Sequence, residues 1–466
     1  MAETLHTGLL IVGGGPGGYV AAIRAGQLGI DTTLVEADRL GGTCLIRGCI
    51  PSKAIIHMAG RFEAMLRASH GGMPGVTLPA PPQLDFAATV AWRDGIVDRL
   101  NKGVTALLRR AKVRVLPGWA VFRDGKSCTV SGPGGEWDIT AEHVLLATGS
   151  LPVELPFLPF GGDMLSSTDA LALDTLPKNL AVIGAGYIGL ELGIAFRKLG
   201  ANVTVVEATD HILPQYDAAL SDPVRKWLSR NGVELHLSAR AKGRNGNALV
   251  VELQDGTLKD VPADKVLVTV GRRPNTEGWG LENMAVDMTG PFVKVDDQCH
   301  TSMRNVWAIG DLAGEPMLEH KAAAQGELVA DIIAGSRRHF EPAVIPAVCF
   351  TEPEIVSVGM LPTPETEKDK NIITAQFPFA ANGRALSMEA GDDGGFVRVL
   401  ARADDHRILG IQAVGAHVAE LSGEFSHALE MGALLEDVAG TIHVHPTLGE
   451  AFHEAALRAL GHAIHI

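Results

Sequence analysis

Short apolar runs that end at glycine-rich turns are the first pattern along the chain. The runs LLIVG (9–13) and LAVIG (180–184) each lead into a glycine-rich turn, and an apolar segment of helical length follows each turn. A second run comes after each of these segments, TTLVE (32–36) or VTVVE (203–207), and both runs end in an acid. Apolar runs of this length that glycine bounds predict buried strands. Each segment is therefore predicted to form a strand–helix–strand unit.

The two units are copies of one repeat. Residues 13–38 and 184–209 align without a gap, and their turn glycines, the leucine–glycine pair after the helix and the final glutamate coincide. Each copy has its own closing strand, HVLLATGS (143–150) in the first and KVLVTVGRRP (265–274) in the second. Internal repetition indicates a structural unit that is used more than once, so we predict two domains of the same fold.

The rest of the chain differs from the repeats in pattern. Proline-rich ELPFLPFGG (154–162) indicates a linker, and NVWAIGDLAG (305–314) predicts a strand that runs into Gly-Asp. The alternating runs GFVRVLAR (395–402) and ILGIQAVGA (408–416) predict strands, with helices after them. The predicted fold is α/β, with two Rossmann-like dinucleotide-binding domains and a C-terminal α+β domain. The predicted ranges are 1–150 and 151–275 for the nucleotide domains, 276–345 for a central domain and 346–466 for the last domain.

Composition and charge narrow the class of protein. The chain has 466 residues with 40 Lys and Arg against 54 Asp and Glu, and its net charge of −14 argues against a nucleic-acid partner. No apolar run is long enough for a membrane span, and the N-terminus MAETLHTGLL lacks the basic region of a signal peptide. Five cysteines are too few for a disulfide-stapled secreted protein, so a reducing, cytoplasmic location is predicted.

Both glycine turns fit the dinucleotide-binding fingerprint. The first contains Gly13, Gly15 and Gly18, and the second contains Gly184, Gly186 and Gly189. In this fingerprint one glycine forms the tight turn, one lets the backbone approach the pyrophosphate, and one lets the helix pack on the strand. A lone motif is weak, but each copy follows a predicted strand, opens a predicted helix and precedes an acid. Two such sites predict two dinucleotides, and an enzyme that holds two usually passes electrons between them.

The acid that ends each second strand indicates which nucleotides bind. Glu207 can accept a hydrogen bond from a ribose 2′-hydroxyl and would repel a 2′-phosphate, and residues 208–211 contain no arginine. NAD is therefore favoured over NADP at the second site. Glu36 fits the adenosine ribose of FAD by the same reasoning. The glycine turns do not distinguish the flavin site, but the segment that directly follows the first copy places the flavin there.

Cys44 and Cys49 lie in that segment, GGTCLIRGCIPSK, and could be a structural staple, metal ligands or a redox couple. Residues five apart lie about 140° apart around a regular helix, so a disulfide between them needs a distorted backbone. Gly48 permits the distortion, and Pro51 suits the first turn of a helix that begins near Cys49. The helix N-terminus and Lys53, one turn further on, favour a thiolate at Cys49. This arrangement favours a redox couple near a flavin.

The cysteine segment resembles that of the flavin-linked disulfide oxidoreductases, which are class I of the pyridine nucleotide-disulfide oxidoreductase family. Among them it is most similar to the dihydrolipoyl dehydrogenases. The resemblance covers essentially the whole chain, through VGGGPGGY, ATGS, IGAGYIGLELG, VGRRPN, AIGDLAG, FTEPEI, ANGRA and HPTLGE, in the order and spacing of the family. It implies FAD and NAD as cofactors and an enzyme that oxidises protein-bound dihydrolipoamide and reduces NAD.

The resemblance also implies partners. The family serves 2-oxo acid dehydrogenase complexes, so a dihydrolipoyl domain and an acyltransferase core are the expected protein partners. AQFPFAANGRALSMEA and the tail HEAALRALGHAIHI look closest to the bacterial forms that serve branched-chain 2-oxo acid complexes. A homodimer is implied as well, with the C-terminal domain as its interface.

Catalytic roles follow from the same resemblance. Cys44 is expected to exchange with the substrate thiols and Cys49 to face the flavin, while Lys53 stabilises the thiolate and the reduced flavin. His445 in HPTLGE is the expected acid–base and Glu450 orients its ring, and an imidazole suits this step at neutral pH. In the family this histidine approaches the disulfide of the other subunit, so the implied dimer has two composite sites.

The matched motifs also imply further cofactor-binding residues. Asp311 in AIGDLAG matches an aspartate that binds the flavin ribityl chain, and Glu191 matches a glutamate near the lysine and the nicotinamide. The other implied cofactor-binding positions are Thr43, Lys53, Thr148, Gly149 and Gly271. No metal ligands are predicted, because the histidines near the C-terminus come without a Cys-x-x-Cys pair.

Other interpretations stay open at this point. A glutathione-type or mercuric reductase of the same family would use NADPH, which Glu207 disfavours, and the tail ALGHAIHI lacks the extra vicinal cysteines of a mercuric reductase. A mainly structural or binding subunit of a complex would not need a cysteine pair and a histidine base. The chain departs from the family at Ile46-Arg47, because asparagine usually follows the leucine there. Arg47 either lies on a solvated face or changes the thiol chemistry.

Overall fold

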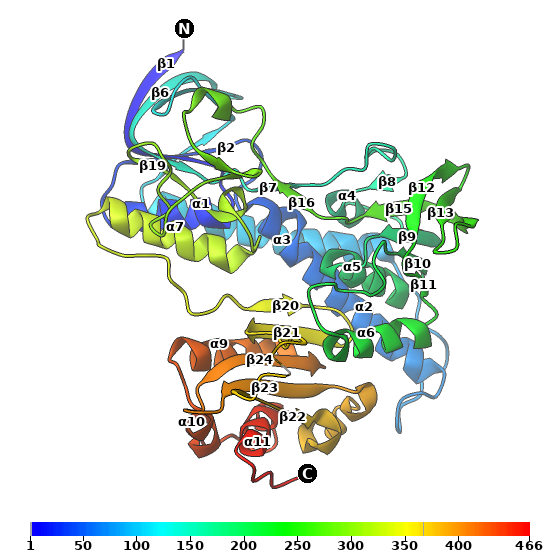
Figure 1. Ribbon diagram of the computed structural model, residues 1–466. Helices are drawn as coiled ribbons and strands as arrows, with labels where there is room; N and C mark the ends of the chain where they lie inside the picture. Colours follow the sequence, from blue (N-terminus) through cyan, green and yellow to red (C-terminus); the bar gives the residue numbers. More distant parts are fainter. Residues whose placement is uncertain (1, 367) are drawn as a thin grey trace.

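The computed structural model describes residues 2–366 and 368–466 (Figure 1). Its first sheet has the strand order β3-β2-β1-β6-β5-β4, and β19 pairs with the C-terminal part of β6. The strands around β1 are parallel, whereas β4, β5 and β6 form an antiparallel meander. The strands are β1 (Glu3–Val12), β2 (Thr32–Glu36), β3 (Arg114–Pro117), β4 (Trp119–Phe122), β5 (Ser127–Gly132), β6 (Gly135–Leu146) and β19 (Val306–Ala308).

The second sheet repeats the start of the first. Its parallel strands have the order β11-β10-β9-β15-β8, so β9 lies between the strand that follows it in the repeat and the closing strand, as β1 does. The strands are β8 (Met164–Leu165), β9 (Asn179–Ile183), β10 (Asn202–Val206), β11 (Glu234–His236) and β15 (Lys265–Val268). The helices beside them are α4 (Ser167–Leu171), α5 (Tyr187–Lys198) and α6 (Ala218–Arg230), and a three-stranded antiparallel sheet adjoins, formed by β12 (Arg240–Asn245), β13 (Ala248–Glu252) and β14 (Leu258–Pro262).

A two-stranded ribbon lies where the chain leaves and re-enters the first unit. β7 (Ser150–Pro152) pairs antiparallel with β16 (Arg272–Pro274). After η2 (Leu281–Asn283), β17 (Met288–Thr289) and β18 (Phe292–Val293), the chain returns to the first sheet as β19. η3 (Gly310–Ala313) then leads to α7 (Glu319–Ile333), which packs along α1 (Pro16–Gln27). Residues 276–345 therefore supply a strand and a helix to the first unit, and the boundaries at 150, 275 and 345 stay predictions.

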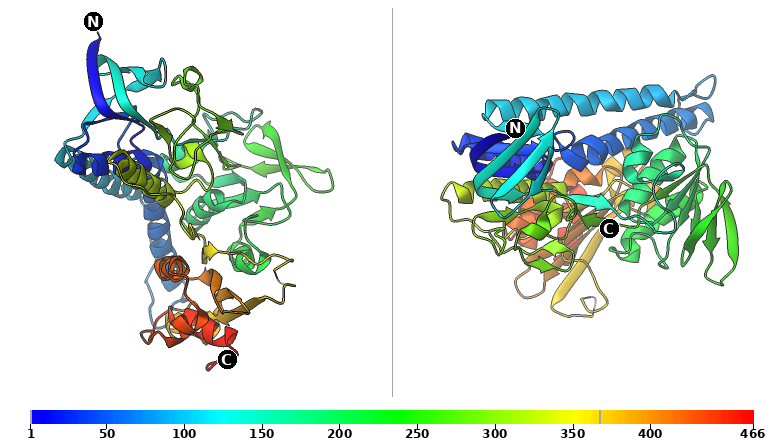
Figure 2. Two further views of the ribbon diagram at one scale, coloured as in Figure 1. Left: turned by 60° about the vertical axis from the view of Figure 1, so that its left-hand side comes forward. Right: turned by 90° about the horizontal axis from the view of Figure 1, so that it is seen from above.

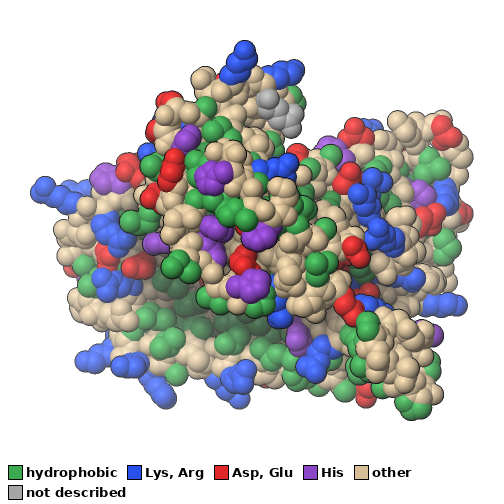
Figure 3. Space-filling view, turned by 90° about the horizontal axis from the view of Figure 1, so that it is seen from below, with side chains coloured by type: hydrophobic (Ala, Val, Ile, Leu, Met, Phe, Trp, Pro, Cys, Tyr) green, Lys and Arg blue, Asp and Glu red, His purple; other side chains and the backbone are tan. Residues whose placement is uncertain are grey.

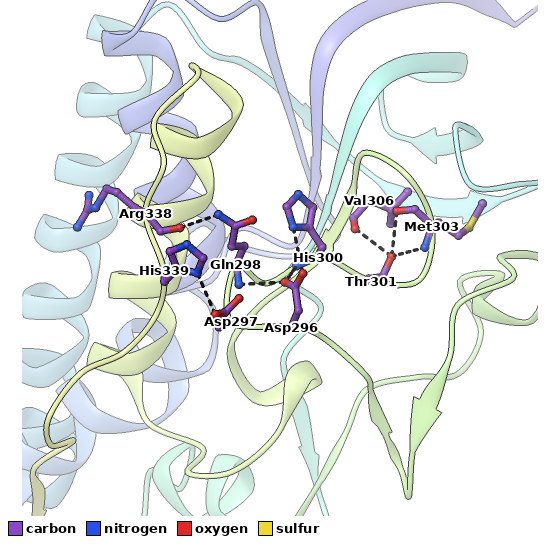
Figure 4. Close-up of polar contacts among 9 residues, drawn as sticks. All are labelled: Asp296, Asp297, Gln298, His300, Thr301, Met303, Val306, Arg338 and His339. Atoms are coloured by element: carbon purple, nitrogen blue, oxygen red, sulfur yellow. Dashed lines mark hydrogen bonds and ion pairs between the residues drawn. The ribbon is translucent and has the colours of Figure 1, made fainter.

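A loop before β19 is tied to the chain that follows α7. Figure 4 shows the Gln298 side chain bonded to the Arg338 carbonyl and His339 bonded to Asp297, at 3.0 and 2.9 Å. Asp297, His339 and Glu341 are all exposed and offer potential ligand atoms within 4.8 Å of one another, a cluster that the sequence did not indicate. Because Asp297 already pairs with the His339 ring nitrogen, we interpret the cluster as a polar link between the loop before β19 and the segment after α7.

The C-terminal domain is an antiparallel sheet with helices against it. Its strand order is β20-β21-β24-β23-β22. The strands are β20 (Ala347–Cys349), β21 (Glu354–Gly359), β22 (Ile372–Pro378), β23 (Phe396–Arg402) and β24 (Ile408–Gly415). Its helical segments are η4 (Phe379–Ala381), α8 (Gly383–Ser387), η5 (Gly391–Asp393), η6 (Val418–Leu421), α9 (Ser422–Glu430), α10 (Leu435–Gly440) and α11 (Glu450–Ala459). The predicted α/β fold with a C-terminal α+β domain is confirmed.

Two long helices, α2 (Cys49–Ser69) and α3 (Phe86–Arg110), lie side by side along one edge of the molecule (Figure 2). α2 also packs on α5, and its Ile55 shares one apolar core with the second sheet and with Phe396 of the C-terminal domain. An ion cluster centred on the largely buried Lys198 side chain crosses the same junction, where Nζ lies 2.9 Å from Glu63 and 2.5 Å from Glu352. The helix that begins at Cys49 is therefore anchored to all three parts of the fold. No helix among the described residues is long and apolar enough to span a membrane.

Candidate active site

The first glycine turn leaves the start of α1 open to a ligand. Gly13 has φ of +104°, and a Cβ there would lie 2.2 Å from the Ala147 carbonyl oxygen. A Cβ on Gly18 would lie 1.8 Å from the Gly13 oxygen, so helix and turn approach too closely for any side chain. Gly15 is the N-cap of α1, and no side chain caps the helix there. Free backbone N–H groups at a helix N-terminus are a phosphate site.

The second turn repeats this geometry. Gly184 has φ of +98°, a Cβ on Gly189 would lie 2.3 Å from the Gly184 oxygen, and Gly186 is the uncapped N-cap of α5. The acids are also held alike. The Gly14 amide donates to Glu36 Oε2 and the Ala185 amide donates to Glu207 Oε2, each at 2.6 Å. Each carboxylate is thus fixed beside its glycine turn, where a ribose would lie.

Cavities adjoin both turns. The smaller, of about 120 Å³, is lined by Gly13, Glu36, Thr148 and parts of β4 and the 275–279 segment. The larger, of about 1030 Å³, is lined by Gly184, Gly186, Glu207 and Gly271 among others. The open helix N-termini, the crowded glycines and the fixed acids fit FAD at the first turn and NAD at the second.

The segments that carry Thr148 and Asp311 meet beside the first turn. The Thr148 hydroxyl donates to the Asn275 carbonyl at 2.9 Å, and Gly149, with φ of +71°, accepts from the Asn275 amide. The Asp311 carboxylate accepts a hydrogen bond from Ser150 Oγ at 2.5 Å. Arg272 in turn donates to Ser150 Oγ at 2.8 Å. The structure therefore places Asp311 at the ribbon between the two nucleotide units, and its role toward the flavin stays a prediction.

The cysteines lie at the junction of two kinds of helix. Thr43–Arg47 form one turn of π-helix, η1, and α2 begins at Cys49. Gly48 joins them with φ of −139° and ψ of −106°, and a Cβ there would lie only 2.8 Å from the Thr43 carbonyl oxygen. The widened turn brings Cys44 and Cys49 close enough for each thiol to shift the pKa of the other, which a regular helix would not allow. The predicted backbone distortion and the helix start at Cys49 are confirmed.

The two thiols differ in acidity. The hydrogen bond from the Cys44 thiol lowers the pKa of Cys49, and the Lys53 ammonium lowers it further against the effect of burial. The same hydrogen bond, with burial, raises the pKa of Cys44. Cys49 is therefore the more acidic of the two thiols, which agrees with the thiolate that the sequence analysis predicts there.

Lys53 is held by two side chains from other parts of the fold. Its Nζ lies 2.7 Å from Glu191 Oε2 and 4.6 Å from the centre of the Phe350 ring. The other oxygen of Glu191 accepts from the Phe350 amide at 2.9 Å, and Glu191 is only 4% exposed. Lys53, Glu191 and Phe350 come from α2, α5 and the strand region after β20. The predicted proximity of Glu191 to Lys53 is present. The part played by Phe350 was missed, because Phe350 begins the matched segment FTEPEI but the sequence analysis gave no role to any residue of that segment.

Arg47 is the last residue of the π-helical turn η1, two positions before Cys49. It pairs with Asp38, just beyond the strand that ends in Glu36. Burial raises the pKa of Glu36, and the Arg47 charge is one of the contributions that lower it. Arg47 is not among the groups that shift either thiol. Of the two interpretations of this departure from the family, the structure favours a half-exposed residue that acts toward Glu36.

His445 and Glu450 form a pair on the C-terminal domain. Between α10 and α11, His445 Nδ1 lies 2.8 Å from Glu450 Oε1, and the Thr447 amide donates to the other carboxylate oxygen at 2.9 Å. Burial would raise the pKa of Glu450, but the Thr447 amide and then His445 bring it below its usual value. The ring is 79% exposed, and no hydrogen bond joins it to a cysteine within the part of one chain that the structure describes. A single chain thus does not complete the predicted site.

Comparison with known proteins decides the family. A model described as pyridine nucleotide-disulphide oxidoreductase matches residues 7–326, and the model of that family's dimerisation domain matches residues 345–456. A dihydrolipoyl dehydrogenase from Pseudomonas aeruginosa is 59% identical, over 100% of both chains. The chain belongs to the pyridine nucleotide-disulphide oxidoreductases.

Other relatives agree with this assignment. A dihydrolipoyl dehydrogenase from Bacillus subtilis is 44% identical to this oxidoreductase, over 99% of this chain and 98% of the relative. The solved structure of LpdA from Mycobacterium tuberculosis is similar with a TM-score of 0.87 and 28% identity, over 97% of this chain and 99% of that one. The predictions of a dihydrolipoyl dehydrogenase-type flavoprotein and of FAD and NAD as cofactors are confirmed.

The oxidoreductase forms a homodimer, as predicted, since its C-terminal part matches the dimerisation domain of the family. That domain exposes apolar side chains near the histidine pair: Met431, Ile442 and Val444 are 71%, 96% and 73% exposed. Figure 3 shows hydrophobic and histidine side chains gathered on the face seen from below. Exposed apolar groups that flank His445 fit a surface that another subunit covers.

Gly48 offers a direct test of the π-helical turn. In Gly48→Ala the new Cβ would contact the Thr43 oxygen, so we expect the free energy of unfolding to fall by about 1–3 kcal/mol, with a large loss of activity. The matched control is Gly60→Ala, further along α2, where a Cβ meets no atom within 4 Å. That change should raise stability by roughly 0.5–1 kcal/mol and keep activity. Thermal unfolding and turnover measure both, and an active, stable Gly48→Ala protein would contradict the close approach.

Proposed function

We propose that this chain oxidises protein-bound dihydrolipoamide to lipoamide and reduces NAD+ to NADH. The observation that carries the proposal is the Cys44–Cys49 pair on its distorted turn, with Lys53 fixed beside it by Glu191. The pair lies in the segment that directly follows the first strand–helix–strand unit, and Glu191 lies on the helix that opens at the second glycine turn. A dithiol substrate, a cysteine pair and two dinucleotide sites make a complete two-electron path.

Thiol–disulfide exchange is the first half of the reaction. His445 of one subunit accepts a proton from a substrate thiol, and the thiolate attacks Cys44 of the other subunit. A bond forms between the substrate sulfur and Cys44, the Cys44–Cys49 bond breaks, and Cys49 leaves as a thiolate. The second substrate thiol displaces Cys44, which leaves with that thiol's proton, and the first proton passes from His445 to water. Lipoamide is released as the cyclic disulfide.

The chain's own residues prepare the second half. Bound FAD supplies the two-electron acceptor between the dithiol and NAD+. The lowered pKa of Cys49 favours the anionic sulfur, and the Lys53 ammonium stabilises that charge. Because Glu191 is buried and also accepts from the Phe350 amide, it holds the lysine in place. The Glu450 carboxylate likewise orients the His445 ring through its contact with Nδ1.

The partners and the location belong to the same proposal. Relatives at 59% and 44% identity are named dihydrolipoyl dehydrogenase, which supports a role as the flavoprotein of 2-oxo acid dehydrogenase complexes, with a dihydrolipoyl domain and acyltransferase core as partners. The branched-chain type is favoured by the sequence of the tail. A cytoplasmic location agrees with the low cysteine count.

One pair of assays separates this function from its alternatives. The purified protein should be yellow, reduce NAD+ with dihydrolipoamide, and oxidise NADPH with glutathione disulfide slowly or not at all. A preference for the second substrate pair would favour a glutathione-type reductase. A protein without flavin absorbance and without either activity would favour a structural or binding subunit.

A further inference from the structure

The larger cavity has a cationic side that the sequence did not reveal. Besides Glu207 and the glycine turn, it is lined by Arg240 and Lys242 of β12. Residues 208–211 supply no arginine, and for that reason the sequence favours NAD. The fold nevertheless brings an arginine to the nucleotide cavity from a strand more than thirty positions further along the chain.

Backbone hydrogen bonds fix this arginine near the ribose acid. The Ala239 amide donates to the Glu207 carbonyl at 2.9 Å, and the Ser238 amide donates to the Thr209 carbonyl at 2.7 Å. The chain thus runs along the end of β10 just before Arg240. Since Glu207 is the residue that faces the adenosine ribose in this fold, Arg240 lies at the adenosine end of the cavity.

The charged groups around Arg240 are paired with other residues, which leaves its guanidinium free to bind a ligand. Lys242 Nζ is paired with Glu252 at 2.8 Å, and Asp210 is paired with His211 at 2.6 Å. The Glu207 carboxylate accepts from the amides of Ala185 and Thr209, at 2.6 and 2.8 Å. Arg240 is exposed, and its side chain forms no hydrogen bond or ion pair with any residue within 2–366 and 368–466. An unpaired guanidinium at a nucleotide cavity suits a phosphate group, which it can hold with two parallel hydrogen bonds.

We propose that Arg240 is a specificity-determining residue that lets the cavity bind an adenosine 2′-phosphate in addition to the 2′-hydroxyl of NAD. The inference rests on the proposed use of this cavity for the pyridine nucleotide. Glu207 repels the phosphate and Arg240 attracts it, so the two opposed residues leave NAD as the better substrate and NADP as a secondary ligand. A site with Glu207 alone would exclude the phosphate.

Two nucleotide fragments test this without turnover. Calorimetry on the holoenzyme compares 2′,5′-ADP, which carries the 2′-phosphate, with 5′-AMP, which lacks it. In Arg240→Ala we expect 2′,5′-ADP to bind about tenfold more weakly while 5′-AMP changes by less than about twofold. Arg240→Lys should restore part of the loss. The matched control is Arg225→Ala, which removes the same charge from α6, where Arg225 pairs with Asp222 and does not line the cavity.

Other outcomes would overturn the inference. If Arg240→Ala weakened the binding of both fragments equally, Arg240 would be a general electrostatic contact. If neither fragment bound more weakly, Arg240 would take no part in nucleotide binding. Glu207→Gln should strengthen 2′,5′-ADP binding, and adding Arg240→Ala should remove that gain. If dihydrolipoamide is not a substrate but the fragment ratio depends on Arg240, the proposed function fails and this inference stands.

Discussion

Cys44→Ser will abolish dihydrolipoamide oxidation and leave a protein that absorbs at long wavelength before any reductant is added. Without the exchange thiol no mixed disulfide forms, so turnover should fall by roughly three orders of magnitude or more. Cys49 remains as a thiolate, because the serine hydroxyl can replace the Cys44 hydrogen bond and Lys53 still lowers its pKa. A thiolate beside oxidised flavin gives a charge-transfer band, which the visible spectrum measures.

Cys49→Ser is the comparison that assigns the two roles. It should be equally inactive but show no such band, because burial still raises the pKa of the Cys44 thiol once Cys49 is gone, and the thiol stays protonated. Cys128→Ala is the control for cysteine removal, since Cys128 is fully buried in β5 and away from the pair. It should keep both activity and the spectrum of the parent protein. A band in Cys49→Ser and none in Cys44→Ser would reverse the assignment.

The pH dependence of the band tests the cause of the low pKa. The largest contribution to it is the hydrogen bond from Cys44. In Cys44→Ala that donor is absent, so the pKa of Cys49 should rise and the band should disappear at a higher pH, as the pH falls, than it does in Cys44→Ser. Lys53 is present in both proteins, so its effect on the pKa of Cys49 is the same in each and does not contribute to the difference. Identical titrations would show that the hydrogen bond does not set the acidity.

Local sequence features predict much of this molecule because they determine local geometry. The glycine turns and their acids depend on residues within one strand–helix–strand unit, and both copies fold as predicted. Gly48 indicates the distorted turn in the sequence, because only glycine fits beside the Thr43 carbonyl oxygen. Such features need no knowledge of how distant segments pack.

Contacts between distant segments were beyond sequence reasoning. Phe350 reaches Lys53 and Glu191 only because the C-terminal domain packs on α2 and α5. Arg240 enters the nucleotide cavity because β12 follows the end of β10, and nothing near Glu207 in the sequence indicates it. The return of residues 306–308 to the first sheet is a pairing of the same kind. Each depends on tertiary packing, which periodicity and motifs do not encode.

Mixed dimers of two inactive variants should regain activity. Cys44→Ser lacks the exchange thiol and His445→Gln lacks the base, and the latter alone should lose about 10²- to 10⁴-fold in turnover. In a mixed dimer, the intact cysteines of one subunit can meet the intact His445 of the other, and this makes one working site. Random exchange of subunits makes about half of the dimers mixed, so total activity should reach roughly a quarter of the parent value.

The outcome decides whether the sites are composite. His445 is 79% exposed and lies among exposed apolar side chains of the C-terminal domain, so its thiol partner should come from across the interface. The control mixes Cys44→Ser with the double variant Cys44→Ser/His445→Gln, in which no dimer has an intact cysteine pair, and it should stay inactive. If the first mixture also stays inactive after subunit exchange is confirmed by size and mass, His445 does not act on the cysteines across the interface. That result would contradict the proposed role of His445 as the base, because within the described residues of one chain no hydrogen bond joins His445 to a cysteine.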